Sequence, residues 1–119
     1  MKKFYFLSSC NSCKRILNHL NLSTDFEMQD IKKAPIGSEE LEQLKTLSGS
    51  YEALFSKHAK LYKELGLKEK TLNETDYKNY ILEHYTFLKR PVLVLNDMIF
   101  IGNSPKVINS AKMALLNEK

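Results

Sequence analysis

The sequence predicts an α/β sandwich, formed as a single domain over residues 1–119, and three observations support this prediction. The first thirty residues have the hydrophobic pattern of a strand, a helix and a second strand. Purely helical patterns follow over about residues 36–87. The rest of the chain then has the pattern of two strands and a closing helix. Two α/β halves around an embedded helical insert therefore indicate one sandwich rather than two linked domains.

The first half begins with Lys3–Leu7, a compact aromatic and aliphatic run that is typical of a buried strand. A helix should begin at Asn11, with an apolar stripe formed by Ile16, Leu17 and Leu20. Thr24–Gln29 then alternates between apolar and polar residues. This pattern predicts a half-buried strand with Phe26 and Met28 on one side.

The insert begins after Pro35 and contains four helical patterns. The first, Leu41–Leu47, is ended by Gly49, and the second covers Tyr51–Phe55. The third, Leu61–Leu65, is followed by a glycine that suits a helix C-terminus. Asn73 and Asp76 favour the N-terminal turn of the fourth helix, whose buried stripe should consist of Tyr77, Tyr80, Ile81 and Tyr85.

The last part of the chain contains two strands and a helix. Val92–Leu95 and Met98–Ile101 flank Asn96–Asp97, a two-residue break typical of a tight hairpin. Ser104 is a favourable N-cap, and the proline after it suits the first helical position. The apolar stripe of this helix should consist of Val107, Ile108, Ala111, Leu115 and Leu116.

The composition is typical of an ordinary globular protein. The formal net charge is +4, but the basic residues are scattered, so charge alone does not indicate a nucleic-acid surface. The longest apolar runs are far below the roughly 18 residues needed to span a bilayer. The apolar core after the N-terminal lysines is only Phe4–Leu7, too short for a signal peptide. We therefore expect a cytoplasmic protein with no membrane partner.

Both cysteines of the chain, Cys10 and Cys13, lie where the first strand ends and the first helix begins. A helix N-terminus stabilises a thiolate through its free N–H groups and its dipole, and Lys14 and Arg15 add positive potential. The pKa of Cys10 should therefore be lowered. Cys13, one turn further into the helix, lies close enough to form a disulfide with it. This spacing between a strand and a helix favours redox chemistry.

Two other interpretations of the cysteine pair stay open. In one, the cysteines are small buried residues with no chemical role. In the other, the pair binds zinc, which needs four ligands, and the further candidates are His19, His58 and His84. We expect no bound metal, because these histidines lack the close spacing of metal ligands. Pro91 is a second indication of redox chemistry, since a proline directly before a strand suits a cis peptide bond placed beside thiols.

The layout resembles the thioredoxin-fold family of the glutaredoxin-linked arsenate reductases (ArsC) and the Spx transcriptional regulators, over nearly the whole chain. The segments that carry this resemblance are Cys10–Arg15, Asp30–Pro35, Tyr62–Leu67 and Leu88–Val94. It implies a thioredoxin-like three-layer sandwich with a mixed four-stranded sheet. The helical insert would then belong to the single domain.

The resemblance also implies a thiol-dependent oxidoreductase. Cys10 would be the nucleophile, Cys13 a resolving thiol, and Arg90 the residue that holds an oxyanion. The substrate would be arsenate, another small oxyanion or a disulfide. Glutathione, glutaredoxin or thioredoxin would supply the electrons, and no cofactor would be bound. The candidate substrate-binding residues are Asn11, Ser12, Lys14 and Pro91.

The chain departs from the arsenate reductases of this family at three places. The arsenate reductases of this family look to use three arginines. The position that matches the first of them is Ser56, and the third would fall in residues 101–104, which contain no basic residue. Ser8 replaces the proline that often precedes the nucleophile by two positions. The alternative function is an Spx-like regulator that senses redox state and binds RNA polymerase.

Overall fold

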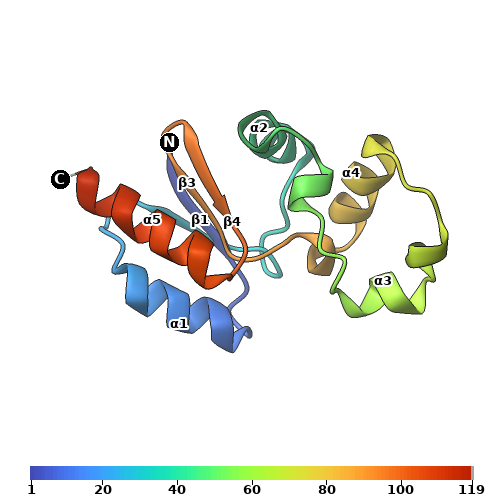
Figure 1. Cartoon of the computed structure of the whole chain (residues 1–119), viewed down its shortest axis with the longest axis horizontal. Helices are drawn as coiled ribbons and strands as arrows, with labels where there is room; N and C mark the ends of the chain where they lie inside the picture. Colours follow the sequence, from blue (N-terminus) through green and yellow to red (C-terminus); the bar gives the residue numbers. More distant parts are fainter. Residues whose placement is uncertain (119) are drawn as a thin grey trace. The chain divides into compact units, whose positions relative to one another are not determined.

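The computed structural model describes residues 1–118, and Lys119, the last residue of the predicted domain, lies outside the described residues. The chain divides into two compact units (Figure 1). The sheet unit comprises Met1–Ala34 and Arg90–Lys119, and the helical unit comprises Pro35–Lys89. Within residues 1–118, no helix has both the length and the apolar character needed to cross a membrane.

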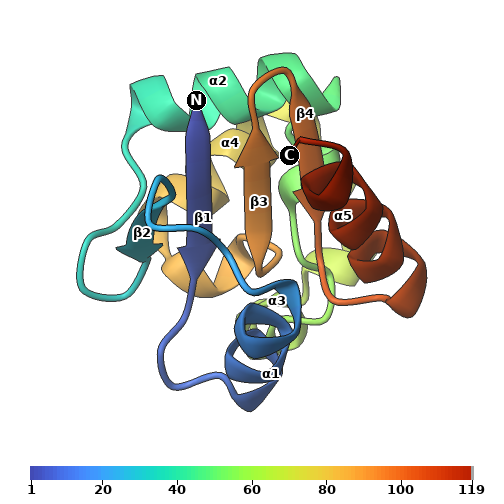
Figure 2. The ribbon, with the colours of Figure 1, turned by 90° about the vertical axis from the view of Figure 1, so that its left-hand side faces the viewer.

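The sheet unit contains a mixed sheet of four strands in the order β2-β1-β3-β4 (Figure 2). Strand β1 (Lys2–Phe6) runs parallel to β2 (Glu27–Asp30) and antiparallel to β3 (Val92–Leu95). Strand β3 pairs antiparallel with β4 (Met98–Ile101). The C-terminal ends of β1, β2 and β4 therefore meet the N-terminal end of β3 at one end of the sheet, which we call the site end.

Two helices, α1 (Asn11–Leu20) and α5 (Pro105–Asn117), cover one face of the sheet (Figure 2). Phe4 of β1 lies opposite Leu93 of β3 in the register of the sheet. Both side chains are buried in a cluster that also includes residues of the two helices. The buried members of this cluster are Phe4, Ile16, Leu20, Phe26, Leu93, Leu95 and Ala111. The stripe predicted for the first helix thus packs into this core, with Leu17 partly buried. Of the stripe predicted for the last helix, Ala111 is buried and Ile108 and Leu115 are partly buried against the cluster, but the prediction is wrong for Leu116, which is 51% exposed.

Local hydrogen bonds set the ends of these two helices. At the N-terminus of α5, the Ser104 hydroxyl accepts a hydrogen bond from the Val107 N–H at 3.2 Å, as its N-cap role predicts. Helix α1 ends at Asn21, which adopts the left-handed conformation with φ 50°. The Lys112 ammonium of α5 donates to the His19 carbonyl at 2.9 Å. This cation at the C-terminal end of α1 ties the two helices together.

The helical unit contains α2 (Ser38–Ser48), α3 (Lys60–Glu64) and α4 (Glu74–Glu83). Helix α4 begins with a capping box, in which the Asn73 side chain accepts from the Asp76 N–H and the Asp76 carboxylate accepts from the Asn73 N–H, both at 2.9 Å. Three short 3₁₀ turns connect the helices, at Glu52–Leu54, Leu67–Glu69 and Tyr85–Phe87.

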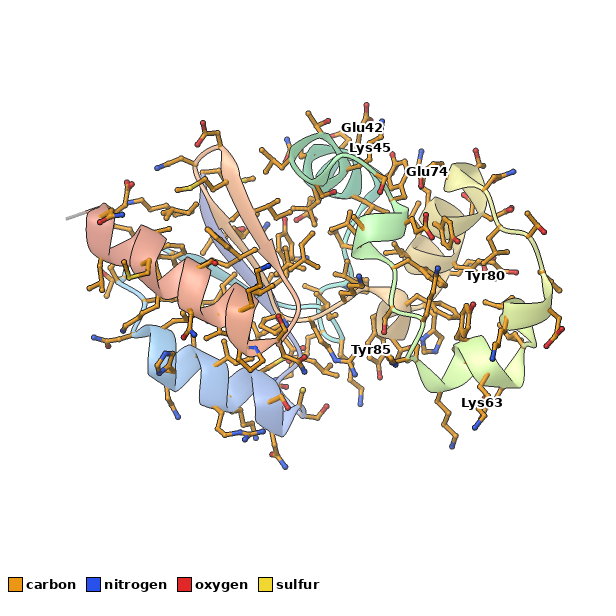
Figure 3. The ribbon with its side chains drawn as sticks, in the orientation of Figure 1. Glu42, Lys45, Lys63, Glu74, Tyr80 and Tyr85 are labelled. Carbon is orange, nitrogen blue, oxygen red and sulfur yellow. The ribbon has the colours of Figure 1, made fainter. Side chains whose placement is uncertain are left out.

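Aromatic side chains form the centre of the helical unit. The Phe55 ring stacks on Phe87 with centroids 5.1 Å apart, and the Tyr77 ring lies 4.9 Å away from Phe55. Tyr80, labelled in Figure 3, packs on Phe87 at 5.5 Å. The Glu74 carboxylate, also labelled there, accepts the backbone N–H groups at the start of the Glu52–Leu54 turn. The start of α4 is thereby anchored to that turn.

The α/β class, the mixed four-stranded sheet and the hairpin bounds are confirmed, but three further local predictions in the strands and the insert are wrong. The second strand begins at Glu27 instead of Thr24, because the Phe26 N–H bonds to the Ser23 carbonyl in a turn. Met28, expected on the buried side with Phe26, is 42% exposed. The helical pattern over Tyr51–Phe55 forms only one 3₁₀ turn, Glu52–Leu54.

The buried stripe expected for the fourth helix of the insert is only partly right. Tyr77 and Ile81 are buried on α4, whereas Tyr80 is half-buried. Tyr85 lies beyond α4, because the chain leaves the helix at His84, whose backbone is extended. Its ring stacks on the His84 ring with centroids 5.2 Å apart (Figure 3).

Candidate active site

The two cysteines lie at the site end of the sheet, on the first turn of α1. The chain leaves β1 through a turn in which the Cys10 N–H donates to the Leu7 carbonyl at 2.9 Å. Cys10 is the N-cap of α1, with an extended backbone at φ −91° and ψ 115°. Cys13 follows one turn later with its side chain buried, and both cysteines are free thiols. The predicted placement at the mouth of the helix is therefore confirmed.

Several donors converge on the Cys10 sulfur. Burial raises the pKa of Cys10, but the neighbouring Cys13 N–H, Cys13 thiol and Ser12 N–H lower it as donors to the thiolate. The positive charge of Arg90 acts in the same direction. Together these interactions outweigh burial and hold the pKa of Cys10 below its ordinary value of 9.0. Free N–H groups at a helix N-terminus thus stabilise the thiolate, as the sequence predicts.

The pKa of the Cys13 thiol is shifted in the opposite direction. Burial is the largest cause that raises the pKa of Cys13, to about 11, and the Leu7 backbone opposes it only in part. The hydrogen bond to Cys10 and the negative charge on that sulfur raise the pKa further. At neutral pH, Cys13 is therefore a protonated thiol that donates to Cys10. The pair is a thiolate beside its own hydrogen-bond donor.

Arg90 reaches this site because β3 is antiparallel to β1, so that the start of β3 lies beside the end of β1. The bond between Arg90 and Pro91 is cis, which confirms that prediction. Pro91 is buried, and its carbonyl accepts the Gly102 N–H at 2.9 Å. The Arg90 Nε atom is buried without a hydrogen-bond partner among the described residues. A buried guanidinium donor of this kind is available to an anionic ligand.

The other predicted binding residues differ in their contacts. Ser12 is half-buried, and its N–H is one of the groups that lower the pKa of Cys10. Its hydroxyl accepts from the Arg15 guanidinium at 3.4 Å. Asn11 and Lys14 are exposed on the first turn of α1. The structure therefore brings Ser12, Cys13 and Arg90 to Cys10, and it leaves Asn11 and Lys14 facing solvent on the same turn.

A carboxylate that the sequence reasoning missed lies at the same end of the sheet. Asp30 ends β2 beside Phe6, the last residue of β1. It accepts hydrogen bonds from Ser8 and from the Lys32 N–H, and the Ser8 hydroxyl is the largest cause that lowers its pKa. The β-α-β pattern could have indicated this carboxylate, because the C-terminal ends of two neighbouring parallel strands lie at the same end of a sheet.

No group of three or more histidine, cysteine, aspartate or glutamate side chains within residues 1–118 is arranged to hold a metal ion. The three histidines considered for zinc are distributed over both units, with His19 on α1 and the other two in the helical unit. The Arg90 guanidinium and a set of backbone N–H groups lie beside the thiols. This arrangement suits nucleophilic thiol chemistry on an anionic or electrophilic substrate.

Comparison with known proteins agrees with this fold. A family model described as the ArsC family matches residues 5–111. A search of curated protein sequences finds no match. An arsenate reductase from Vibrio cholerae is similar in structure, with a TM-score of 0.76 and 22% identity over 92% of this chain and 96% of that one. An arsenate reductase (ArsC) related protein from Brucella melitensis has a TM-score of 0.69 and 18% identity, over 92% of each chain.

A protein of Staphylococcus aureus, solved by NMR in solution, is more similar in sequence than these two. It is 28% identical to the chain, with a TM-score of 0.72, over 92% of this chain and 97% of that one. The alignments to the solved structures thus cover nearly the whole chain. The thioredoxin-like fold implied by the sequence resemblance is thereby confirmed.

Proposed function

The chain belongs to the ArsC family, and we propose that it is a thiol-dependent oxidoreductase in which Cys10 is the nucleophile. The observation that carries this proposal is that the pKa values of the two thiols are shifted in opposite directions. Cys10 is partly exposed and its pKa is lowered, whereas Cys13 is buried and its pKa is raised to about 11. A thiolate is the reactive form of cysteine, so attack begins at Cys10.

Cys13 is proposed as the resolving thiol. With a disulfide substrate, the Cys10 thiolate attacks one sulfur, forms a mixed disulfide and releases the first product thiolate. Cys13 then loses its proton and attacks the Cys10 sulfur, which forms the Cys10–Cys13 disulfide and releases the second thiolate. Two electrons pass from the protein to the substrate. The mutual effect of the two side chains on each other's pKa supports this role, because it requires the two sulfurs to lie near each other before the reaction.

The second substrate class is a small oxyanion, of which arsenate is one example. Cys10 would attack the central atom and displace one oxygen as water, and attack by Cys13 on the Cys10 sulfur would leave two electrons on that atom. Arg90 is proposed to hold the anionic oxygens, supported by its charge beside the thiols and its unpartnered Nε. Structural similarity to the arsenate reductase of Vibrio cholerae agrees with this class. Ser56, in place of an arginine, sets the chain apart from the arsenate reductases.

The reaction leaves a Cys10–Cys13 disulfide that an external thiol must reduce. Glutathione, glutaredoxin and thioredoxin are the candidate donors, and all act by thiol–disulfide exchange. No bound cofactor is required, because the electrons pass only between sulfur atoms and the substrate. Reducing thiols of this kind are abundant in the cytosol, which is the proposed location.

A coupled reductase assay with single-cysteine variants tests the proposal. The chain should oxidise a glutathione- or thioredoxin-coupled system in the presence of a disulfide or an oxyanion. Cys10→Ser should abolish turnover. Cys13→Ser should stop the cycle after the first step and leave a Cys10 adduct that mass spectrometry identifies. Undiminished turnover in Cys10→Ser would reject the proposal, and capture of RNA polymerase without turnover would favour the Spx-like regulator.

A further inference from the structure

The two outer strands of the sheet, β2 and β4, differ in how they are protected from pairing with another chain (Figure 2). Two of the four residues of β2, Glu27 and Asp30, are acidic. Strand β4, over Met98–Ile101, contains no charged residue and no proline. Charged residues and prolines are common means by which an outer strand avoids pairing with a second chain. Within residues 1–118, β3 is the only strand that pairs with β4, so the outer side of β4 is open.

The backbone groups on this open side belong to Ile99 and Ile101. The Gly102 N–H, just after β4, donates to the Pro91 carbonyl at 2.9 Å and so points towards β3. Successive residues of an antiparallel ladder alternate in this respect. Phe100 therefore directs its N–H and C=O groups to β3, whereas Ile99 and Ile101 direct theirs away from it. No backbone group of the described residues bonds to these four groups on the open side.

A groove of about 550 Å³ lies between this strand and the outer face of α5. Met98 and Phe100 line it from the strand, and Met113 and Ala114 line it from the helix. Met98 is 38% exposed and Met113 is 60% exposed, although both side chains are apolar. Glu118 is the only charged side chain in the lining. The open side of β4 and this groove together form one surface, which we call the β4 surface.

The two ends of the β4 surface carry opposite charges. Helix α5 runs antiparallel to β4, because the Asn96 amide, just before the strand, donates to the Glu118 carboxylate at the end of the helix at 3.2 Å. Asp97 lies at this same end, is exposed, and forms no ion pair with another described residue. Lys106, on the first turn of α5, is exposed at the opposite end. No aspartate or glutamate occurs in residues 98–117, so the surface is acidic at one end and basic at the other.

We propose that the β4 surface binds a second copy of this chain, with the two β4 strands paired antiparallel across a two-fold axis. The two sheets then form one continuous eight-stranded sheet, with four strands from each copy. Ile99 of one copy exchanges both backbone hydrogen bonds with Ile101 of the second copy, and the symmetric pair does the same. All the open backbone groups of β4 are thereby satisfied. Phe100 lies opposite its own counterpart at the axis, as a self-complementary interface requires.

The charges favour a second copy as the occupant of this surface. In the proposed register, Asp97 of one copy lies opposite Asn103 of the second copy, three residues before Lys106 of that copy. The acidic end of each chain therefore meets the basic end of the other, and this happens twice in the dimer. A parallel pairing would place like charges together. Met113, near the middle of α5, approaches its own counterpart and covers the apolar groove.

Molecular mass as a function of concentration tests the dimer, independently of any thiol chemistry. One strand edge and one helix face form a small interface, so the full chain is studied by sedimentation equilibrium in reductant from about 10 μM to about 1 mM. The mass should rise from 13.8 kDa towards twice that value. Hydrogen exchange at the Ile99 and Ile101 amides should slow at least about tenfold over the same range. A mass of 13.8 kDa at every concentration would overturn the proposal.

Met113→Lys tests the groove, and Leu116→Lys is its matched control. Both residues are exposed apolar side chains of α5, at 60% and 51%, but Leu116 does not line the groove. Met113→Lys should raise the dissociation constant at least about tenfold, because it brings two ammonium groups together near the axis. Leu116→Lys should change it less than about twofold. Equal effects of the two variants would overturn the interface, because a general loss of exposed apolar surface would then explain them.

Charge reversal tests the register. Asp97→Lys and Lys106→Glu each place like charges together at both ends of the interface, and each should weaken the dimer about fivefold. The double variant restores opposite charges and should return to within about twofold of the parent chain. A double variant as weak as either single variant would make the antiparallel register wrong. A dimer whose Ile99 and Ile101 amides exchange as fast as in the monomer would show that the copies associate elsewhere, and would also overturn the proposal.

Discussion

Selective alkylation of the two thiols is the sharpest consequence of the site geometry. The perturbation is a limiting amount of iodoacetamide at pH 7. With a pKa of about 11, Cys13 is a thiolate for only about 10⁻⁴ of the time. Cys10, whose pKa lies below 9.0, is a thiolate for more than about 1% of the time. Ionisation alone thus favours Cys10 by at least about 100-fold.

Two further effects adjust this ratio in opposite directions. The Cys10 thiolate is the weaker nucleophile, and a Brønsted slope of about 0.4–0.5 over two pKa units costs it roughly tenfold. Burial hinders Cys13, whose side chain is only 1% exposed. At least about tenfold selectivity for Cys10 therefore remains before the steric effect is counted.

Digestion and peptide mass analysis after partial labelling provide the assay. Repeating the labelling across the pH range should give an alkylation midpoint for Cys10 below 9.0. In Cys13→Ala, the midpoint should move to higher pH, because the thiol that donates to the Cys10 sulfur is lost. Faster labelling of Cys13, or equal midpoints for the two thiols, would refute the assignment of their roles.

Three other outcomes follow from individual contacts. Arg90→Lys should slow reaction with an anionic substrate about tenfold and change the melting temperature little, because lysine keeps the charge but loses the planar fork; equal losses in both would make Arg90 structural. Lys112→Met should lower the free energy of unfolding in urea by about 0.5–1 kcal/mol, because its bond to the His19 carbonyl caps α1; no change would exclude that cap. The pKa of Cys13 is about 11 in the folded chain, above the 9.0 of an ordinary thiol. The stability that the protonated Cys13 contributes is therefore complete below pH 9 and is lost as the pH rises through 11. Between these pH values the free energy of unfolding should therefore fall about 1–2 kcal/mol further than in Cys13→Ala, and parallel curves would exclude this linkage.

Elements whose signals are local were predictable from the sequence. The helix from Asn11 to Leu20 has a strong apolar stripe, and Ser104 with the following proline marks the start of α5. The hairpin strands Val92–Leu95 and Met98–Ile101 match their predicted bounds for the same reason. Weak local signals failed: the Tyr51–Phe55 pattern was too short to nucleate an α-helix, and only a 3₁₀ turn formed.

At the candidate site, the sequence by itself determined the placement of the two thiols. Cys10 and Cys13 are three residues apart on one helical turn, so their proximity and the helix-end electrostatics follow from local geometry. Pairing between distant strands decided the rest. The antiparallel register of β1 and β3 brings Arg90 to Cys10, and the parallel register of β1 and β2 brings Asp30 to the same end of the sheet.

The contact between α1 and α5 depends on tertiary structure in the same way. Lys112 and His19 are 93 positions apart in the chain, and nothing in their local sequence relates them. They form a hydrogen bond because α1 and α5 pack on the same face of the sheet. Helix and turn signals extend over only a few residues of the chain. The residues that surround a reactive sulfur depend instead on which strands and helices pack against one another in the folded core.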